Sequence, residues 1–338
     1  MTNPCLRIAA PGRVVLDDAP MPQLADGEVA VLVRYVALCG SDVKLYHGAY
    51  TAPHSYPVVL GHEWVGRIEQ VTASAATQWQ VGDIVTGDCS IFCGQCPRCK
   101  IDVNHCLTIQ KRGITRNGAC ARHIAVNARH LHRCPSERDI KPFVLSEPLA
   151  VAFQGIHNRV SAAALSHAQN ALIIGGGGIG IASMIALLEA GIPSITIADP
   201  VAEKRALISS FGLANVTTVS ALPATSDAYD LIVEAAGSGA TLSQALCLAA
   251  PLATIVCLGH QGPVEIDGGA LIKKSLTIIG SIGSSGGFEK AIAAIHAHRP
   301  IVAKMITRTV PIADAQLFFT RDLDHEVNVK VVIDLTVL

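Results

Sequence analysis

The sequence lacks the features that mark membrane and nucleic-acid-binding proteins. Charged residues make up only 16% of its 338 residues, and the two signs nearly cancel to a net charge of −1. This balance provides no basic surface that would attract nucleic acid or anionic lipid. Gly or charged residues interrupt the longest apolar stretches, so no membrane-spanning helix is predicted. We therefore expect neither a nucleic acid nor a membrane as partner.

Aromatic residues are also scarce, at 4%, but apolar residues reach 50%, which excludes a disordered chain. A chain of this length suits two domains better than one core. The N-terminus has no basic segment followed by an apolar one, so we see no signal peptide and expect a cytoplasmic protein. In that setting the eleven cysteines favour thiolate metal ligands over disulfides.

The chain shows two kinds of sequence pattern, which together predict an α/β protein. Residues 1–151 are rich in short β-like runs, Gly and Pro, which predicts a barrel-like β domain. In residues 152–290, runs of β-branched residues alternate with helical segments, which predicts a parallel sheet covered on both faces. Residues 291–338 contain a further strand. The clearest strands are expected at 29–36, 64–71, 81–86, 171–174, 194–198, 231–234, 253–257, 276–279 and 329–333, and helices at 179–190 and 202–211.

A glycine-rich turn in the second domain matches the G-x-G-x-x-G pattern of dinucleotide-binding sites. It follows a predicted strand and opens a predicted helix, which is the context that this pattern requires. Gly175 permits the tight turn, Gly177 lets the backbone approach a pyrophosphate, and Gly180 allows close helix–sheet packing. Gly178 and Ile179 begin the helix, whose free N–H groups would face the anion.

Asp199 ends the next predicted strand, 19 residues after Gly180, which is the distance expected for a ribose partner. A carboxylate there accepts hydrogen bonds from the ribose hydroxyls and repels a 2′-phosphate, so we expect NAD rather than NADP. Lys204 and Arg205 lie close by, and either cation could instead hold such a phosphate.

Metal-ligand residue types gather in the first domain. Cys39, His62, Glu63 and Glu147 are the ligand types that zinc accepts, and three protein ligands with one open position are typical of a catalytic site. Glu63 and Glu147 can exchange roles as ligand and as base.

Two residues that follow Cys39 have two compatible roles. Ser41 is a candidate to carry a proton away, and Asp42 is a candidate to orient His62. Both could instead cap a helix at 43–47. His47 could extend the proton path, or line a substrate pocket together with Tyr46, Trp64 and Arg116.

A second cysteine group lies in one short segment. Cys93, Cys96, Cys99 and Cys106 are four thiols within fourteen positions. Four thiolates complete a tetrahedral zinc site and leave no open position, so this group is predicted to be structural. An iron–sulfur cluster or a redox pair is the alternative. Cys89 is interpreted as a buried strand residue, with a role as a stray ligand as the alternative.

These motifs, in this order, resemble the zinc-dependent medium-chain dehydrogenases. The Glu147-Pro148-Leu149 stretch resembles the sorbitol or polyol branch, in which Glu replaces a Cys ligand. The segments 61–64 and 116–120 are also similar to aminocyclitol dehydrogenases. One departure is the spacing from Cys99 to Cys106, which is one residue shorter than in the family.

The resemblance implies a GroES-like β-barrel catalytic domain completed by the C-terminal segment, and a Rossmann domain, with the active site between them. It implies a catalytic zinc on Cys39, His62 and Glu63 or Glu147, a second, structural zinc, and a homodimer or homotetramer. The expected reaction is NAD-dependent oxidation of a secondary alcohol of a polyol, sugar or cyclitol to the ketone. The alternatives are an amino-alcohol, threonine-type or phosphorylated substrate, the reverse reduction, or a non-catalytic binding protein.

Overall fold

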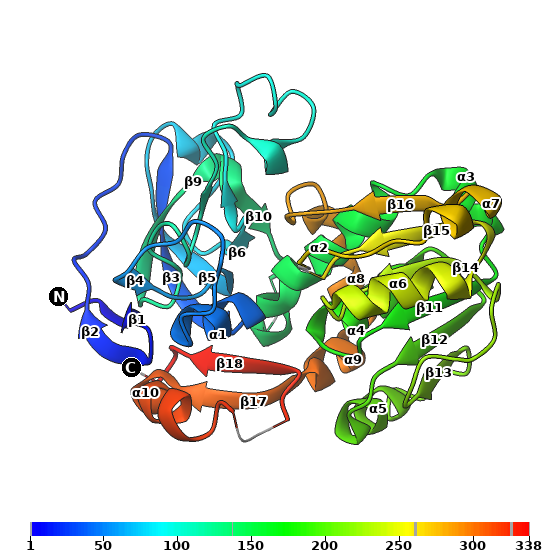
Figure 1. Cartoon of the computed structure of the whole chain (residues 1–338). Helices are drawn as coiled ribbons and strands as arrows, with labels where there is room; N and C mark the ends of the chain where they lie inside the picture. The colour runs from blue at the N-terminus through cyan, green and yellow to red at the C-terminus, as the bar shows by residue number, and fades with distance from the viewer. Residues whose placement is uncertain (1, 137, 260–261, 325–326, 338) are drawn as a thin grey trace. The chain divides into compact units, whose positions relative to one another are not determined.

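The computed structural model describes residues 2–136, 138–259, 262–324 and 327–337 (Figure 1). It divides the chain into two compact units, Met1–Glu147 joined by Ile306–Leu338, and Pro148–Met305. The second unit therefore continues past the expected end at residue 290. Helices α8 (Phe288–Ala297) and α9 (Arg299–Met305) lie within it, and α8 packs against α4 (Gly178–Glu189).

The first unit is built around strand β3 (Glu28–Ala37). Val29, Val31 and Val33 alternate with less buried residues and point into the core. The main sheet has the order β10-β6-β5-β3-β18-β17, and β9 also pairs with β3. These strands span Leu131–Arg133, Ile84–Gly87, Glu63–Val71, Glu28–Ala37, Lys330–Asp334, Ile306–Pro311 and, for β9, His123–Asn127. A smaller sheet has the order β2-β1-β4, with bounds Arg13–Asp18, Pro4–Ala10 and Val58–Val59.

The C-terminal segment is part of this first unit. After helix α10 (Ile312–Arg321), strand β18 enters the main sheet between β17 and β3, and Val332 lies opposite Ala37. The segment that the resemblance assigned to the catalytic domain therefore completes its central sheet, beginning at Ile306.

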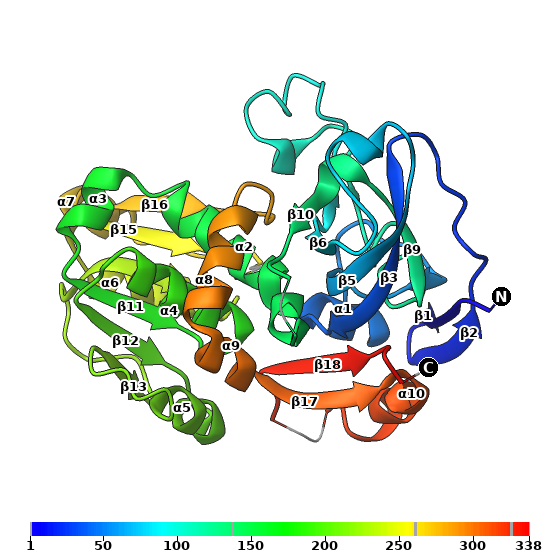
Figure 2. The ribbon, with the colours of Figure 1, turned by 180° about the vertical axis from the view of Figure 1, so that it is seen from behind.

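The second unit contains a six-stranded parallel sheet of order β13-β12-β11-β14-β15-β16. The strands span Val216–Val219, Ser194–Ala198, Asn170–Ile174, Tyr229–Glu234, Ala249–Cys257 and Thr277–Gly280. This is the doubly wound Rossmann order, as the sequence predicted. Helix α6 (Gly239–Leu248) covers one face in Figure 1, and Figure 2 shows α4 and α8 on the other. Among the described residues, no helix is both long and apolar enough to cross a membrane.

Candidate active site

Strand pairing brings three distant segments of the first unit to one end of its main sheet. Ala37 at the end of β3 lies opposite Glu63 at the start of β5, so Cys39 and His62 are neighbours. On the other side of β3, Val332 pairs with Ala37, so the start of β18 lies beside Cys39 as well. Antiparallel register therefore assembles the site from residues 39, 62–63 and 330.

Cys39, His62 and Glu63 form a ligand group. One atom from each, the thiol sulfur, a ring nitrogen and a carboxylate oxygen, lies within 4.8 Å of the others. His62 and Glu63 are buried, and Cys39 is partly exposed at the N-cap of α1 (Gly40–Tyr46). A soft thiolate, an imidazole and a carboxylate fit a zinc site with three protein ligands.

Asp42 holds the two ligand segments together. Its Oδ2 accepts a hydrogen bond from the Cys39 backbone N–H at 2.8 Å, and its Oδ1 accepts one from Gly61 N–H at 3.2 Å. The same Oδ1 lies 4.0 Å from His62 Nδ1, which is an ion-pair distance rather than a hydrogen bond. Helix α1 begins at Gly40 and not at Val43, so Cys39 is the N-cap and Asp42 lies in the first turn.

Lys330 is the residue of this site that sequence reasoning missed. Its ammonium contacts both carboxylate oxygens of Glu63, at 2.7 Å for Oε2, and the side chains of Lys330 and Glu63 are 6% and 1% exposed. Burial opposes the charged ammonium, but the Glu63 carboxylate outweighs it and raises the pKa of Lys330. A buried Lys at the start of an otherwise apolar strand is the signal that could have indicated it.

The other residues predicted for this site lie outside the three-residue ligand group. Glu147 is buried in the first turn of α2 (Ser146–His157), outside the three-residue ligand group. The Ser41 hydroxyl is buried and has no hydrogen-bond partner among the described residues. His47 forms an ion pair with Asp324, with 3.1 Å between Nε2 and Oδ1, and the His47 side chain is 40% exposed.

Three further side chains that the sequence offered as site candidates are buried outside the two ligand groups. Tyr46 and Trp64 lie in the hydrophobic core of the first unit, so packing explains them. The Cys89 side chain is buried but belongs to neither ligand group found among the described residues.

The local charges predict that Cys39 is a thiolate in the metal-free protein. Burial opposes the thiolate, but His62 and Lys330 outweigh it and lower the pKa of Cys39 from the ordinary 9.0 to about 6. Iodoacetamide should therefore alkylate Cys39 near its maximal rate at neutral pH, and the rate should fall as the pH drops through about 6. Peptide mass spectrometry of the chelated protein measures this, and His62→Gln should move the midpoint upward. A midpoint near 9 would contradict the assignment.

The four-cysteine group forms a compact lobe, drawn as the cyan loop of Figure 1. The sulfurs of Cys96 and Cys99 lie 3.5 Å apart, those of Cys93 and Cys106 3.7 Å, and those of Cys93 and Cys99 3.9 Å. A tetrahedron of sulfurs at zinc-ligand distance has an edge of about 3.8 Å. The four thiols therefore fit a structural zinc, and the shorter spacing before Cys106 does not prevent closure.

The glycine turn adopts the predicted conformation. Gly175 has a φ of +103°, which favours glycine, and a Cβ at Gly180 would lie 1.8 Å from the Gly175 carbonyl oxygen. A Cβ at Gly177 would meet no atom within 4 Å, so the backbone there is open to a ligand. The turn links β11 to the start of α4 at Gly178. A phosphate group fits this helix N-terminus.

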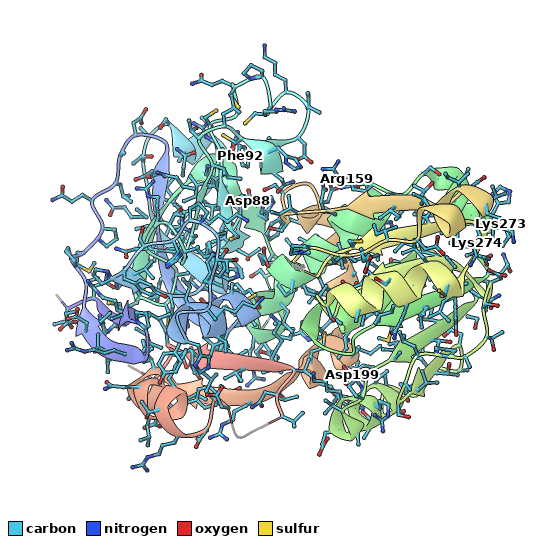
Figure 3. All side chains as sticks on the ribbon, in the orientation of Figure 1. Asp88, Phe92, Arg159, Asp199, Lys273 and Lys274 are labelled. Atoms are coloured by element: carbon cyan, nitrogen blue, oxygen red, sulfur yellow. The ribbon has the colours of Figure 1, made fainter. Side chains whose placement is uncertain are left out.

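Asp199 lies at the carboxyl end of β12, as predicted (Figure 3). Its Oδ2 accepts a hydrogen bond from Gly176 N–H at 2.7 Å, and its Oδ1 accepts one from Val201 N–H at 2.8 Å. Lys204 Nζ lies 3.9 Å from the same carboxylate, and Arg205 Nη1 donates to the Asp199 and Pro200 carbonyls. Both cations therefore contact the loop that follows β12.

Two known protein families match this chain, one in each part of the sequence. The alcohol dehydrogenase GroES-like domain matches residues 25–136, and the glucose dehydrogenase C-terminus matches residues 141–335, more than half of the chain. The chain belongs to the zinc-type medium-chain alcohol dehydrogenases. It is therefore an NAD(P)-dependent oxidoreductase that oxidises alcohols, with a Cys/His/Glu site and a four-cysteine structural site.

The similarity of this dehydrogenase to its relatives covers nearly the whole chain. It is 28% identical to D-altritol 5-dehydrogenase of Agrobacterium fabrum over 328 residues, 95% of this chain and 96% of that one. A Sinorhizobium meliloti 1021 structure of a zinc-binding dehydrogenase with NADP is 25% identical, with a TM-score of 0.88 and 99% of both chains covered. The RspB alcohol dehydrogenase of Escherichia coli CFT073, bound to NADH, is also 25% identical, with a TM-score of 0.85 and 99% of both chains covered.

Glu234 is a second residue that the sequence analysis did not single out, and it holds a loop of the second unit of the dehydrogenase in place. Glu234 at the end of β14 is fully buried, and its Oε1 accepts hydrogen bonds from the backbone N–H groups of Ala236 and Gly237 and from the Thr241 hydroxyl. The carboxylate therefore fixes the loop that follows β14, the strand that pairs with β11. An acidic residue that ends a buried strand was the available signal.

Proposed function

We propose that the dehydrogenase oxidises a secondary alcohol of a polyol, sugar or cyclitol to the ketone, with NAD as the hydride acceptor. The observation that carries this proposal is the Cys39, His62 and Glu63 group in one unit, together with the Asp199 turn in the other. The polyol class rests on Glu147 in place of a fourth soft ligand and on the likeness to D-altritol 5-dehydrogenase.

We assign the catalytic zinc to Cys39, His62 and Glu63, with Glu147 as the carboxylate that can replace Glu63. Zinc bound there supplies a Lewis acid that lowers the pKa of the substrate hydroxyl, and the dinucleotide accepts the hydride. Cys39 and His62 provide the fixed part of the site because Asp42 holds both of their segments. Lys330 offsets the charge of Glu63, which keeps the buried donor set from carrying excess negative charge.

The proton released from the substrate needs a polar group near Cys39. The buried Ser41 hydroxyl has no hydrogen-bond partner among the described residues, so it is free to accept and donate one. We assign it the first step of proton removal. His47, exposed and paired with Asp324, is our candidate to pass the proton to solvent. Asp42 positions Cys39 and His62 and takes no proton in this scheme.

We assign the phosphates of the cofactor to Gly175, Gly177, Gly178, Ile179 and Gly180, and the adenosine ribose to Asp199. Lys204 and Arg205 flank the ribose position. We expect Asp199→Ala to lower kcat/KM for NAD by roughly 10- to 100-fold, since a charge-assisted hydrogen bond is lost, and to narrow the advantage over NADP. Steady-state kinetics with both cofactors measures the ratio. Asp199→Asn, which keeps an acceptor of the same shape, should fall between; an unchanged ratio in both variants would refute the ribose assignment.

The direct test of the function is a substrate panel. Absorbance at 340 nm is followed with NAD and with polyols, sugar alcohols, cyclitols, their amino and phosphate derivatives and threonine, before and after chelation of zinc. Turnover of an unsubstituted polyol or cyclitol that chelation abolishes supports the proposal. Turnover restricted to threonine or to phosphorylated substrates would replace the substrate class, and no turnover with full zinc content would refute the reaction.

A further inference from the structure

The first unit contains a cavity that none of the assigned functions uses. Its volume is about 520 Å³, and all of the described residues that line it belong to the first unit. The lining includes neither the ligand group of Cys39, His62 and Glu63 nor any part of the glycine turn. It is therefore distinct from both the zinc site and the dinucleotide site.

Arg112 is the residue that makes this cavity unusual. Arg112 is only 8% exposed, and its Nε is buried with no hydrogen-bond partner among the described residues. Neither an ion pair nor a side-chain hydrogen bond links this guanidinium to another described residue. Burial lowers the pKa of Arg112 to about 10, so the side chain is still charged at neutral pH. A buried charge without a partner destabilises the folded protein, and an anion in the cavity would offset that cost.

The groups around Arg112 are mostly donors. Arg116 lies at the cavity wall and uses Nη1 on Gln110, which leaves its other nitrogens free. Asn117 accepts a hydrogen bond from Val59 N–H at 3.1 Å through its oxygen, so its amide nitrogen is available to a ligand. Among the described residues, the one carboxylate in the lining is Glu28, whose Oε2 accepts a hydrogen bond from Ala25 N–H instead of pairing with Arg112.

Two histidines also line the cavity. His123 and His130 both line the cavity, and the Nδ1 atom of each is buried without a hydrogen-bond partner among the described residues. His130 is held in place by the Phe92 ring, with centroids 4.6 Å apart, and by Asp88, whose Oδ2 lies 3.7 Å from Nδ1; Figure 3 labels Phe92 and Asp88. His130 Nδ1 therefore lies beside the Asp88 carboxylate, and His123 Nε2 lies 2.9 Å from Glu69 Oε2. The Nδ1 atom of His123 is what this pair can add to the donors of the cavity wall.

We propose that this cavity binds a small oxyanion, a phosphate or carboxylate group, with the Arg112 guanidinium as its central contact. A guanidinium matches both groups because it presents parallel N–H donors to two oxygens. Arg112 also connects the cavity to the zinc site through the backbone. Its N–H donates to the Cys89 carbonyl at 2.9 Å, and the next residue, Gly113, packs directly against Gly61. A ligand here would thus stabilise the strand ends that carry His62.

The test uses the full-length, zinc-loaded protein saturated with NAD, so that the dinucleotide site is already filled. Thermal unfolding is followed while inorganic phosphate, or separately acetate, replaces chloride at constant ionic strength. We expect a saturable rise in the melting temperature of roughly 3 °C at a large excess of the bound anion. A rise with phosphate, with acetate or with both supports the site and identifies the group that it takes.

The variants locate the effect. Arg112→Met should abolish the rise, and Arg112→Lys, which keeps the charge but not the paired donors, should keep only part of it. The matched control Arg98→Met, on the exposed cysteine lobe, should behave as the wild type. Arg116→Met, at the cavity wall, should weaken the binding and is informative if Arg112→Met does not fold. No saturable rise in the wild type, or an equal rise in Arg112→Met or Arg116→Met, would overturn the proposal.

Discussion

Replacing Cys39 with serine should reduce kcat by at least about 10³-fold, since several kcal/mol of Lewis-acid stabilisation are lost with the catalytic zinc. A serine hydroxyl has nearly the shape of the thiol, but it does not ionise near neutral pH and is a poor ligand for zinc. NAD binding should be nearly unchanged because the glycine turn and Asp199 lie in Pro148–Met305, a separate compact unit. Steady-state kinetics, NAD titration by fluorescence and zinc analysis measure the three effects.

The same substitution elsewhere provides the control. Cys247→Ser changes an exposed cysteine that belongs to neither ligand group, so it should leave turnover, NAD binding and zinc content unchanged. The expected zinc content of Cys39→Ser is one ion per chain, held by the four-cysteine lobe. If Cys39→Ser lost NAD binding together with turnover, the metal at Cys39 would be structural, and the catalytic assignment would be wrong.

The sequence predicted the second unit well because its signals are local. Short β-branched runs gave the strands at 171–174, 194–198 and 231–234 within two residues of their observed bounds, and the glycine pattern located the turn before α4. Strand β13 (Val216–Val219) was not predicted, since Thr-Thr at its centre gives no apolar run. Its place in the sheet comes from pairing with β12, which is a tertiary contact.

The first unit was harder to predict because its contacts are distant in sequence. Residue types alone grouped Cys39, His62, Glu63 and Glu147, and the structure brings the first three together. No local pattern places Lys330 beside Glu63, 267 residues earlier in the chain. That contact depends on β18 joining β3 in one register, with Val332 opposite Ala37. The same reasoning applies to Arg112, because only the folded structure shows that its guanidinium lacks a side-chain partner among the described residues.

The buried pair of Lys330 and Glu63 has the second large expected effect. Lys330→Met keeps the length and packing of the side chain but leaves the Glu63 carboxylate buried without a cation. Removing one partner of a buried ion pair destabilises a protein by about 3–5 kcal/mol. We expect a loss of that size in the free energy of unfolding of the chelated, metal-free protein, in which no zinc ion compensates Glu63, measured by urea denaturation. The pKa of Cys39 should also rise in the metal-free variant, because Lys330 is one of the charges that lower it.

Two further variants separate the ion pair from loss of packing. In the same metal-free protein, Lys330→Met combined with Glu63→Gln removes both charges and should recover most of the lost stability, since no buried charge is left unpaired within the pair. Arg7→Met breaks the pair with Asp17, in which the side chains are 23% and 49% exposed, and should cost at most about 1 kcal/mol. If Lys330→Met were as stable as Arg7→Met, the ammonium would not compensate Glu63, and the Glu63 carboxylate would have to be neutral in the folded protein. Equal destabilisation of the single and double variants would instead assign the effect to the packing of the Lys330 stem.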